Sequence, residues 1–483
     1  MLRTNKDVYD AVIIGAGISG LVCGCYLAKA GMKVLIAEQH HKPGGYCTSF
    51  KRGGFTFDAA AHSFGSYRDG GNMNRVFKDL DLDKRINVSR DNPSDIIVTP
   101  DYRIRFWTDI NRTIEELENA FPNEMRIREF ITFMRDPKPV EMAALRKKTF
   151  GDLLDHYFKN HRLKTILSIT MLGNGGLPPS KMSAFTGAKI FTEFLLDGGY
   201  YPEGGMQRLP DELAIRFKEM GGTLQLRCAV KKIRIDGNTV SGVIIDDNSL
   251  IRSKYVISNC DARQTFLKFI TGRSLNKDFL TRLRSMTPTL SMFILYLGLS
   301  KYLEELPEPG CTGWFLPHYD IEEMYLSAKH RTAYNLGAFL LRVSPDGKSI
   351  IAMVNAPFKN KRYWETNKSK MVEAFIEKIQ LSGMNSISKH IIYKDAASPY
   401  TLYRYTSNYK GAAYGWESTP SQFANLELRK PIFIQGLYLT GHWTTYAQGV
   451  AGVTYLGYDT AKLILRKHKL LPKTTELYDM ILK

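Results

Sequence analysis

A glycine-rich turn near the N-terminus constrains the fold of this chain more than any other feature. An apolar run, Val8 to Ile14, leads into Gly15-Ala16-Gly17-Ile18-Ser19-Gly20, and a helix-compatible segment follows. The first glycine of this pattern permits a tight turn, the second lets the backbone approach a pyrophosphate, and the third allows close packing of helix and strand. Glu38 ends a second apolar run 23 residues after Gly15, where a carboxylate can hold ribose hydroxyls. The pattern predicts a Rossmann-like unit that binds a dinucleotide, either NAD or FAD, at a helix N-terminus.

Composition places the chain among ordinary folded proteins. Of its 483 residues 44% are hydrophobic and 24% are charged, and this length favours two domains. The net charge of +18 favours contact with an anionic surface, although a basic composition throughout would give the same value. Because the sequence has neither zinc-finger spacing nor an RNP-type aromatic signature, nucleic acid is not an expected partner.

Three further features indicate where the protein works. The longest mostly apolar run, Leu290 to Leu299, is about half the ~20 residues that a membrane span needs. The first seven residues are polar and contain no apolar signal region. The six cysteines are scattered without a CxxC pair, which argues against a metal site and fits a reducing compartment. We therefore expect a cytoplasmic protein that associates peripherally with an anionic membrane surface.

The pattern of the chain changes several times along its length. Helix-like segments run from about 66 to 200, and three alternating segments with Asp-Gly-Asn-type turns then predict a meander at 231–235, 240–245 and 251–257. A last strand-and-helix unit covers about 436–466. These changes predict an α/β fold with a Rossmann-like dinucleotide-binding domain and a discontinuous second α+β domain for the substrate. The first is assigned residues 1–70, 200–265 and 400–483, and the second residues 71–199 and 266–399.

One helical stripe in the second domain has two interpretations. Phe150, Leu153, Leu154, Tyr157 and Phe158 fall at helical spacing and are flanked by basic residues. Such a stripe either packs on a core or lies on lipid at a membrane interface.

Several later segments carry a family resemblance. Residues 43–49, which contain Gly44-Gly45-Tyr46, and residues 54–58 resemble the flavoprotein superfamily of monoamine oxidases, protoporphyrinogen oxidases and carotenoid desaturases. Within it, residues 198–206 (GGYYPEGGM), 256–262 (VISNCDA) and the closing segments 436–444 and 449–453 are similar to motifs of phytoene-desaturase-like proteins. The resemblance covers nearly the whole chain and implies non-covalently bound FAD and a carotenoid desaturase, isomerase or retinol-saturase type of activity.

The closing motif departs from the family pattern at one position. Many relatives have Gly-Asp where this chain has Gly441-His442, and a histidine can bond a hydroxyl but is not a fixed anion. Because the glycines are kept, FAD binding is still expected, with altered affinity or redox tuning. The expected cofactor-binding residues are Gly15, Gly17, Ile18, Ser19, Gly20, Glu38, Gly44, Gly45, Tyr46, Val230, Gly441, His442, Gly449 and Val450.

Few polar residues are candidates for chemistry. Hydrogen transfer on an unactivated carbon chain needs the flavin and a water-free apolar channel rather than many acids and bases. Phe185, Phe191, Phe194, Leu195 and 290–299 are candidates for that channel, or for plain core packing. The candidate catalytic residues are His62, Arg404, Tyr414 and Trp416, and for His62 a structural, hydrogen-bonded role is the favoured alternative.

These observations predict an FAD-dependent oxidoreductase that acts on an apolar isoprenoid polyene. Desaturation by hydride transfer to flavin N5, cis–trans isomerisation and double-bond reduction share one scaffold, and the sequence does not separate them. A soluble flavin amine oxidase and a non-catalytic prenyl-binding module of the same fold are the alternatives. The intact set of Gly15, Gly17, Gly20 and Glu38 argues against the last of these.

Overall fold

Two seven-stranded sheets organise the molecule, which we describe from a computed structural model that covers residues 8–270, 275–330, 336–422, 428–431, 433–444 and 448–468. In the first sheet β9, β2, β1, β12 and β18 run parallel in that order, and β10 and β11 continue it as an antiparallel meander joined to the first residues of β12. Its strands are β1 (Val8–Ile14), β2 (Val34–Ala37), β9 (Thr223–Gln225), β10 (Val230–Asp236), β11 (Thr239–Ile245), β12 (Leu250–Ser258) and β18 (Leu437–Leu439).

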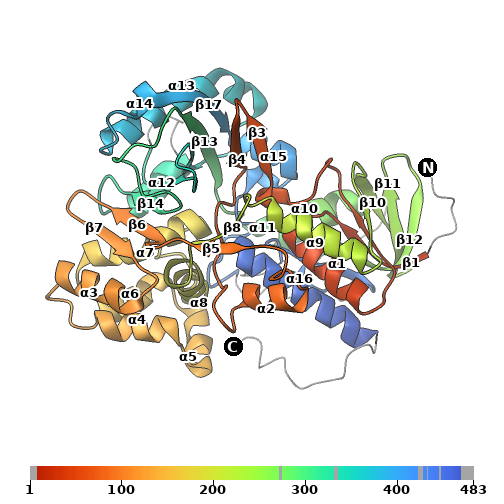
Figure 1. Cartoon of the computed structure of the whole chain (residues 1–483). Coiled ribbons are helices and arrows are strands. Elements are labelled where there is room, and N and C mark those ends of the chain that lie inside the picture. The colour runs from red at the N-terminus through yellow and green to blue at the C-terminus, as the bar shows by residue number, and fades with distance from the viewer. Residues whose placement is uncertain are drawn as a thin grey trace.

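Helices drawn from distant parts of the chain cover one face of this sheet. A Cβ on Gly457 would lie 2.5 Å from the carbonyl oxygen of Ser19, so α16 presses directly on α1 (Figure 1). These helices are α1 (Ile18–Lys29), α2 (Asn72–Asp79), α9 (Arg208–Glu219) and α16 (Gly449–Lys467). The opposite face packs on the meander, α10 (Ala262–Gln264) and α11 (Lys277–Ser285).

The second sheet is mixed and has the order β17-β13-β16-β15-β14-β6-β7, in which only the β14–β6 pair is parallel. Along β13 every residue is buried, because alternate side chains point to two apolar cores. The strands are β6 (Asp95–Val98), β7 (Arg103–Phe106), β13 (Ser291–Leu299), β14 (Thr312–Phe315), β15 (Phe339–Val343), β16 (Ser349–Ala356) and β17 (Ile391–Ala397).

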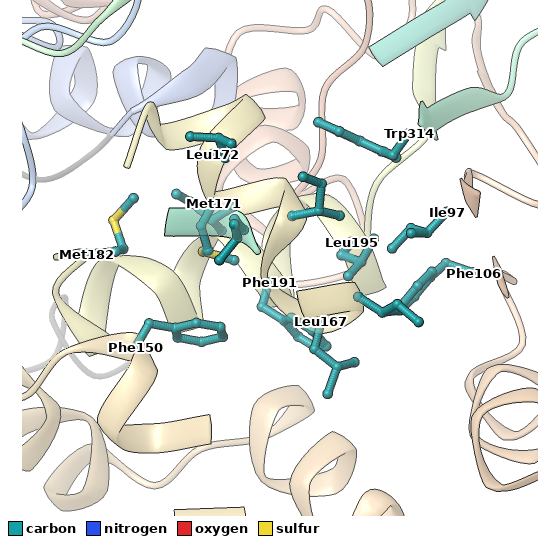
Figure 2. Packing of buried hydrophobic residues seen from close by; sticks show 14 of the residues in the cluster. Ile97, Phe106, Phe150, Leu167, Met171, Leu172, Met182, Phe191, Leu195 and Trp314 are labelled. Atoms are coloured by element: carbon teal, nitrogen blue, oxygen red, sulfur yellow. The ribbon is translucent and has the colours of Figure 1, made fainter. Parts of the chain in front are cut away.

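A cluster of helices covers one face of the second sheet. Phe150, Leu167 and Phe191 pack inside it (Figure 2), so the stripe at Phe150 faces a protein core and not lipid. The cluster comprises α3 (Ile110–Ala120), α4 (Ile127–Arg135), α5 (Pro139–Ala144), α6 (Phe150–Tyr157), α7 (His161–Gly175), α8 (Ala184–Ile190) and the π-helical turn Phe191–Leu196, with α12 (Ile321–His330) beside it. The other face packs on α13 (Lys361–Leu381) and α14 (Ile387–His390).

Two small two-stranded sheets and a short helix connect the halves. The hairpin of β3 (Ser49–Arg52) and β4 (Phe55–Asp58) reaches from the first sheet to the second beside α15 (Pro399–Thr406) (Figure 1), and Phe55 contacts the ring of Tyr393 there. Strands β5 (Val88–Arg90) and β8 (Tyr200–Pro202) pair at the other crossing point. The α/β fold with two sheet-based parts is confirmed, whereas the residue boundaries assigned to the domains stay predictions.

Candidate active site

The glycine-rich turn closes tightly between β1 and α1. Gly15 has φ of +96°, a conformation that favours glycine, and its N–H donates to the carbonyl oxygen of Ala37 at 2.8 Å. A Cβ on Gly20 would collide with the carbonyl oxygen of Gly15, so the helix rests directly on the turn. Four residues of the turn line a large cavity: Gly15, Gly17, Ile18 and Ser19. Gly20 lies outside the lining, and its close contact with Gly15 fits the expected packing of helix on strand, whereas its place among the cofactor-binding residues stays a prediction.

Glu38 is fixed against this turn. Its Oε2 accepts a hydrogen bond from the Ala16 N–H at 2.7 Å and its Oε1 accepts one from the His40 N–H at 2.9 Å. The side chain is 7% exposed and lines the cavity. Since a carboxylate accepts about four hydrogen bonds, both oxygens keep capacity for ribose hydroxyls.

The double glycine lies beside the turn. Gly44 has φ of +130° and donates its N–H to the Ala16 carbonyl oxygen at 2.9 Å, and a Cβ on Gly45 would meet only the Cα of Gly17. Tyr46 donates its hydroxyl to the carbonyl oxygen of Ala412 at 3.0 Å. Gly44, Gly45 and Tyr46 all line the cavity, as does Val230 at the start of β10.

The C-terminal strand and helix form the opposite wall. Thr440 follows β18 and shares a 2.7 Å hydrogen bond with the hydroxyl of Ser19, which ties this wall to α1. A Cβ on Gly441 would lie 2.6 Å from Asn259 Oδ1, and one on Gly17 would lie 2.9 Å from Asn259 Nδ2. The lining residues on this side include Gly441, His442, Gly449 and Val450.

These residues together form a cradle that fits FAD. Gly17 and Gly441 leave bare backbone around Asn259, where side chains would fill the space, and Gly44 leaves bare backbone elsewhere in the lining. Backbone N–H groups at the start of α1 suit the diphosphate, and Glu38 suits the ribose. The first residues of α16 line the cavity, so the positive end of that helix can stabilise negative charge on a reduced flavin ring.

Two buried histidines line the same cavity. Burial lowers the pKa of His442 to about 4, and burial together with the charge of Arg342 lowers the pKa of His62 to about 4. His62 Nδ1 lies 3.1 Å from the carbonyl oxygen of Ala60, which fixes the proton on Nδ1 and leaves Nε2 as an acceptor. Both rings are neutral at physiological pH, so neither replaces the fixed anion of relatives that have Gly-Asp at the closing motif.

The side of the cavity formed by the second sheet is mainly apolar. Its residues come from the π-helical turn, β13, β16, β14 and α15: Phe194, Met292, Ile294, Met353, Trp314 and Leu402. Of the predicted channel residues, Phe194 and two residues of 290–299 are found here. Phe185, Phe191 and Leu195 are buried in the helical core instead, and they do not line the cavity.

The predicted catalytic residues separate into two pairs. His62 and Tyr414 line the cavity, and Tyr414 donates its hydroxyl to the Gly173 carbonyl oxygen at 2.6 Å. Trp416 and Arg404 are not in the lining. Trp416 is buried with its Nε1–H bonded to the Trp443 carbonyl oxygen at 2.9 Å, and Arg404 is exposed on α15 with its guanidinium over the Tyr405 ring. Core packing holds the Trp416 side chain and the Arg404 side chain is exposed, so neither placement supports a catalytic role, and both assignments stay predictions.

Asn259 and Asp95 are among the cavity residues that the sequence interpretation missed. Asn259 lies in the quoted segment 256–262, and its side chain lies between Gly17 and Gly441 and donates to the Gly15 carbonyl oxygen at 3.4 Å. Its position directly after a buried strand was the available signal. Asp95 opens β6 and lines the cavity, and nothing in the sequence pattern singled it out.

Comparison with known proteins places the chain among flavoenzymes. The family described as "Flavin containing amine oxidoreductase" matches residues 18–465, nearly the whole described chain. The chain belongs to this family. It is therefore a flavin-dependent oxidoreductase that uses FAD, as the resemblance implied.

Relatives of known activity lie within the same family. The chain is 25% identical to the all-trans-retinol 13,14-reductase of Danio rerio, with 91% of this chain and 83% of that protein aligned. It is 24% identical to the chloroplastic prolycopene isomerase of Arabidopsis thaliana, with 94% and 82% aligned. These relatives confirm the predicted resemblance to the carotenoid desaturase-like group.

Solved structures share the fold. An oxidoreductase from Methanosarcina mazei superposes with a TM-score of 0.66 at 17% identity and covers 94% of this chain and 99% of its own. Putrescine oxidase bound to putrescine gives a TM-score of 0.64 at 14% identity, with 95% and 99% covered.

The described residues contain neither a membrane-spanning helix nor a metal-binding cluster. No helix there is both long enough and apolar enough to cross a membrane. No cluster of three or more His, Cys, Asp or Glu side chains in that part of the chain is arranged to hold a metal ion.

Proposed function

We propose that this enzyme transfers hydride between FAD and the carbon chain of an isoprenoid polyene. The observation that carries the proposal is the apolar wall of Phe194, Met292, Ile294 and Met353, which lines the same cavity as the glycine cradle. Bound FAD supplies the hydride acceptor or donor at N5. Relatives named for retinol reduction and prolycopene isomerisation support a substrate of this class.

The protein's own contribution is mainly orientation and exclusion of water. The apolar side chains bind a polyene through burial of its surface, worth about 25 cal/mol per Å². Neutral His62 leaves Nε2 in a position to accept a hydrogen bond or proton in the cavity, and Tyr414 is held in place by its bond to α7. Such a site needs no dense set of acids and bases.

An anaerobic incubation tests the proposal and separates its three forms. FAD-loaded enzyme is mixed with phytoene, prolycopene and all-trans-retinol while flavin absorbance and products are followed. Bleaching of oxidised flavin indicates desaturation, turnover with reduced flavin and no net oxidation indicates isomerisation, and consumption of reduced flavin indicates double-bond reduction. Peroxide release from small primary amines without reaction of any polyene would overturn the proposal in favour of an amine oxidase. Colourless protein after incubation with FAD would favour the non-catalytic prenyl-binding alternative.

We also propose that the enzyme takes its substrate from an anionic membrane surface, as a peripheral cytoplasmic protein. The net charge of +18 supports this, as does α5, whose Val140 is 74% exposed at the outer end of the helical cluster (Figure 1). Exposed basic side chains flank it in the sequence: Arg135, Lys138, Lys147 and Lys148. Exposed apolar and basic residues in one segment are typical of interfacial contact.

A further inference from the structure

One carboxyl group interrupts the apolar wall of the substrate side. Asp95 is 7% exposed at the start of β6 and lines the same cavity as Phe194 and Met292. Burying a carboxyl group is costly unless hydrogen bonds compensate for the lost water. A polar group retained at such a position is therefore a candidate for ligand binding.

The protein satisfies this carboxyl group only in part. Trp314 donates its Nε1–H to Asp95 Oδ1 at 2.8 Å, and the hydroxyl of Ser94 bonds the carboxyl group as well. The Trp314 ring is itself fixed, since it is 3% exposed and pressed against Gly173 of α7. Because a carboxylate has about four acceptor sites, Asp95 keeps capacity for a hydrogen bond with a molecule in the cavity.

The surrounding charge indicates which kind of group it would bind. The described residues provide Asp95 with no ion-pair partner, and the nearby cation, Arg342, is paired with Asp91 at 2.9 Å. The charge of Arg342 still acts on both Asp95 and His62, which disfavours a second cation beside them. Burial raises the pKa of Asp95 to about 6, so its carboxyl group protonates readily. A neutral hydroxyl group suits both forms, because it donates to the carboxylate and accepts from the acid.

We propose that the polyene substrate carries a hydroxyl group and that Asp95, held in place by Trp314, binds it. Asp95 then selects an isoprenoid alcohol over the corresponding ether or hydrocarbon, while the apolar wall binds the carbon chain. This inference rests on the proposed function, which supplies the isoprenoid class but leaves its end group open. Discrimination of this kind is strong, since a ligand without the hydroxyl leaves a buried polar group unpaired.

Equilibrium binding to the oxidised, FAD-loaded enzyme tests the assignment. Flavin absorbance is titrated under anaerobic conditions with all-trans-retinol, its methyl ether and prolycopene. Wild type is expected to bind retinol about tenfold or more tightly than the ether, as a hydrogen bond to a charged group implies. Asp95→Leu should bring that ratio close to one, and Trp314→Phe should reduce it by several-fold.

Matched variants keep the result interpretable. Asp95→Asn has the same shape, and its flavin content and Tm show whether the fold is intact; it should keep part of the preference because an amide still bonds a hydroxyl. Met353→Leu changes the apolar wall alone and should shift the Kd of retinol and the ether by equal factors.

Four outcomes would overturn the assignment. If Asp95→Leu lost the same factor of binding affinity for retinol and for its methyl ether, the carboxyl group would have only a structural role. Tighter, Asp95-dependent binding of retinylamine would assign the position to an ammonium group. Binding and turnover of prolycopene without preference for the alcohol would overturn the hydroxyl assignment alone, whereas binding of none of the polyenes by FAD-loaded protein would overturn the proposed function with it.

Discussion

Single glycines shape the cofactor site, because the cradle requires positions that carry no side chain. Gly17 and Gly441 lie on opposite walls, yet a Cβ on either would come within 2.9 Å of the Asn259 side chain. Side chains larger than hydrogen at these positions would occupy space that a diphosphate requires. The cradle is thus sensitive to a volume change of a few atoms, in the way that close-packed interiors generally are.

Replacement of Gly17 should abolish flavin retention. Gly17→Val places branched carbon atoms against Asn259 in the cradle, and we expect the purified variant to lose nearly all of its absorbance near 450 nm. Gly337→Val is the matched control, because a Cβ there would meet Met324 only at 3.7 Å. Yellow protein with normal FAD content from Gly17→Val would contradict the assignment of this turn.

The two cavity histidines link stability to pH. Each has a pKa lowered from 6.5 to about 4 by burial, so the unfolded chain binds more protons than the folded protein between those values. Stability therefore falls as the pH drops from about 6.5 to 4. The full effect is up to about 3 kcal/mol for each group.

Substitution of these histidines should flatten the acid side of the stability profile. Tm is measured from pH 7 to pH 4.5 for wild type, His62→Gln and His442→Gln. We expect the Tm difference between wild type and each variant to become less favourable to wild type as the pH falls, because glutamine does not titrate. A Tm difference that does not change with pH would show that the folded protein solvates or pairs the protonated histidine rings, so that burial does not lower their pKa.

At the level of elements, the contact between α1 and α16 joins the two walls of the cradle. A Cβ on Gly457 would lie 2.5 Å from the carbonyl oxygen of Ser19, a backbone atom that cannot rotate away. Thr440, which follows β18, connects the same two helices, because it shares a hydrogen bond with Ser19 of α1 at 2.7 Å and accepts one from the hydroxyl of Thr460 in α16 at 3.3 Å. The spacing of α1 and α16 therefore sets the width of the site.

A single methyl group at this contact should destabilise the protein. Alanine favours helix over glycine by about 1 kcal/mol, so Gly457→Ala would stabilise α16 if there were room. We expect the opposite: overpacking should lower the free energy of unfolding by about 1–3 kcal/mol and weaken FAD binding. Thermal unfolding and flavin titration measure both, with Gly337→Ala as the control. An unchanged or raised Tm would show that the helices separate freely.

At the level of the whole molecule, the two sheets lie in different halves, and the helical cluster lies beside the second sheet, away from the first (Figure 1). Residues from both halves line the cavity. The first sheet supplies the cradle and the second supplies the apolar wall and Asp95. The proposed membrane contact would act through exposed positive charge, whose attraction for anionic lipid extends over about a Debye length, ~8 Å at physiological salt.

Membrane association should depend on charge around α5. In liposome flotation with vesicles that contain anionic lipid, we expect binding that weakens from 0.05 to 0.5 M salt, because the exposed charges are screened. The triple variant Lys138→Glu, Lys147→Glu, Lys148→Glu should bind several-fold less. The variant Lys231→Glu, Lys232→Glu, Lys277→Glu carries the same charge change away from α5 and should bind nearly as wild type. Flotation that is absent, or insensitive to salt, would contradict the proposal.

The sequence alone determined the features that depend on local backbone geometry. Glycines at fixed spacing after an apolar strand predicted the Rossmann-like turn, and the resemblance of the motifs at Gly44–Gly45 and Gly441 predicted FAD and the family, which the family match confirms. Such motifs are readable because each glycine answers a short-range steric demand.

Tertiary structure alone decided which side chains share the cavity. Arg404 and Trp416 had the right residue types and lie near the closing motif in the sequence. However, Arg404 is exposed to solvent and Trp416 is packed in the core, so neither lines the cavity. Asp95 shows the converse, because only the pairing of β6 with β14 brings its carboxyl group to Trp314, 219 residues away. Contacts at that separation follow from how the second sheet assembles, and no local sequence pattern encodes them.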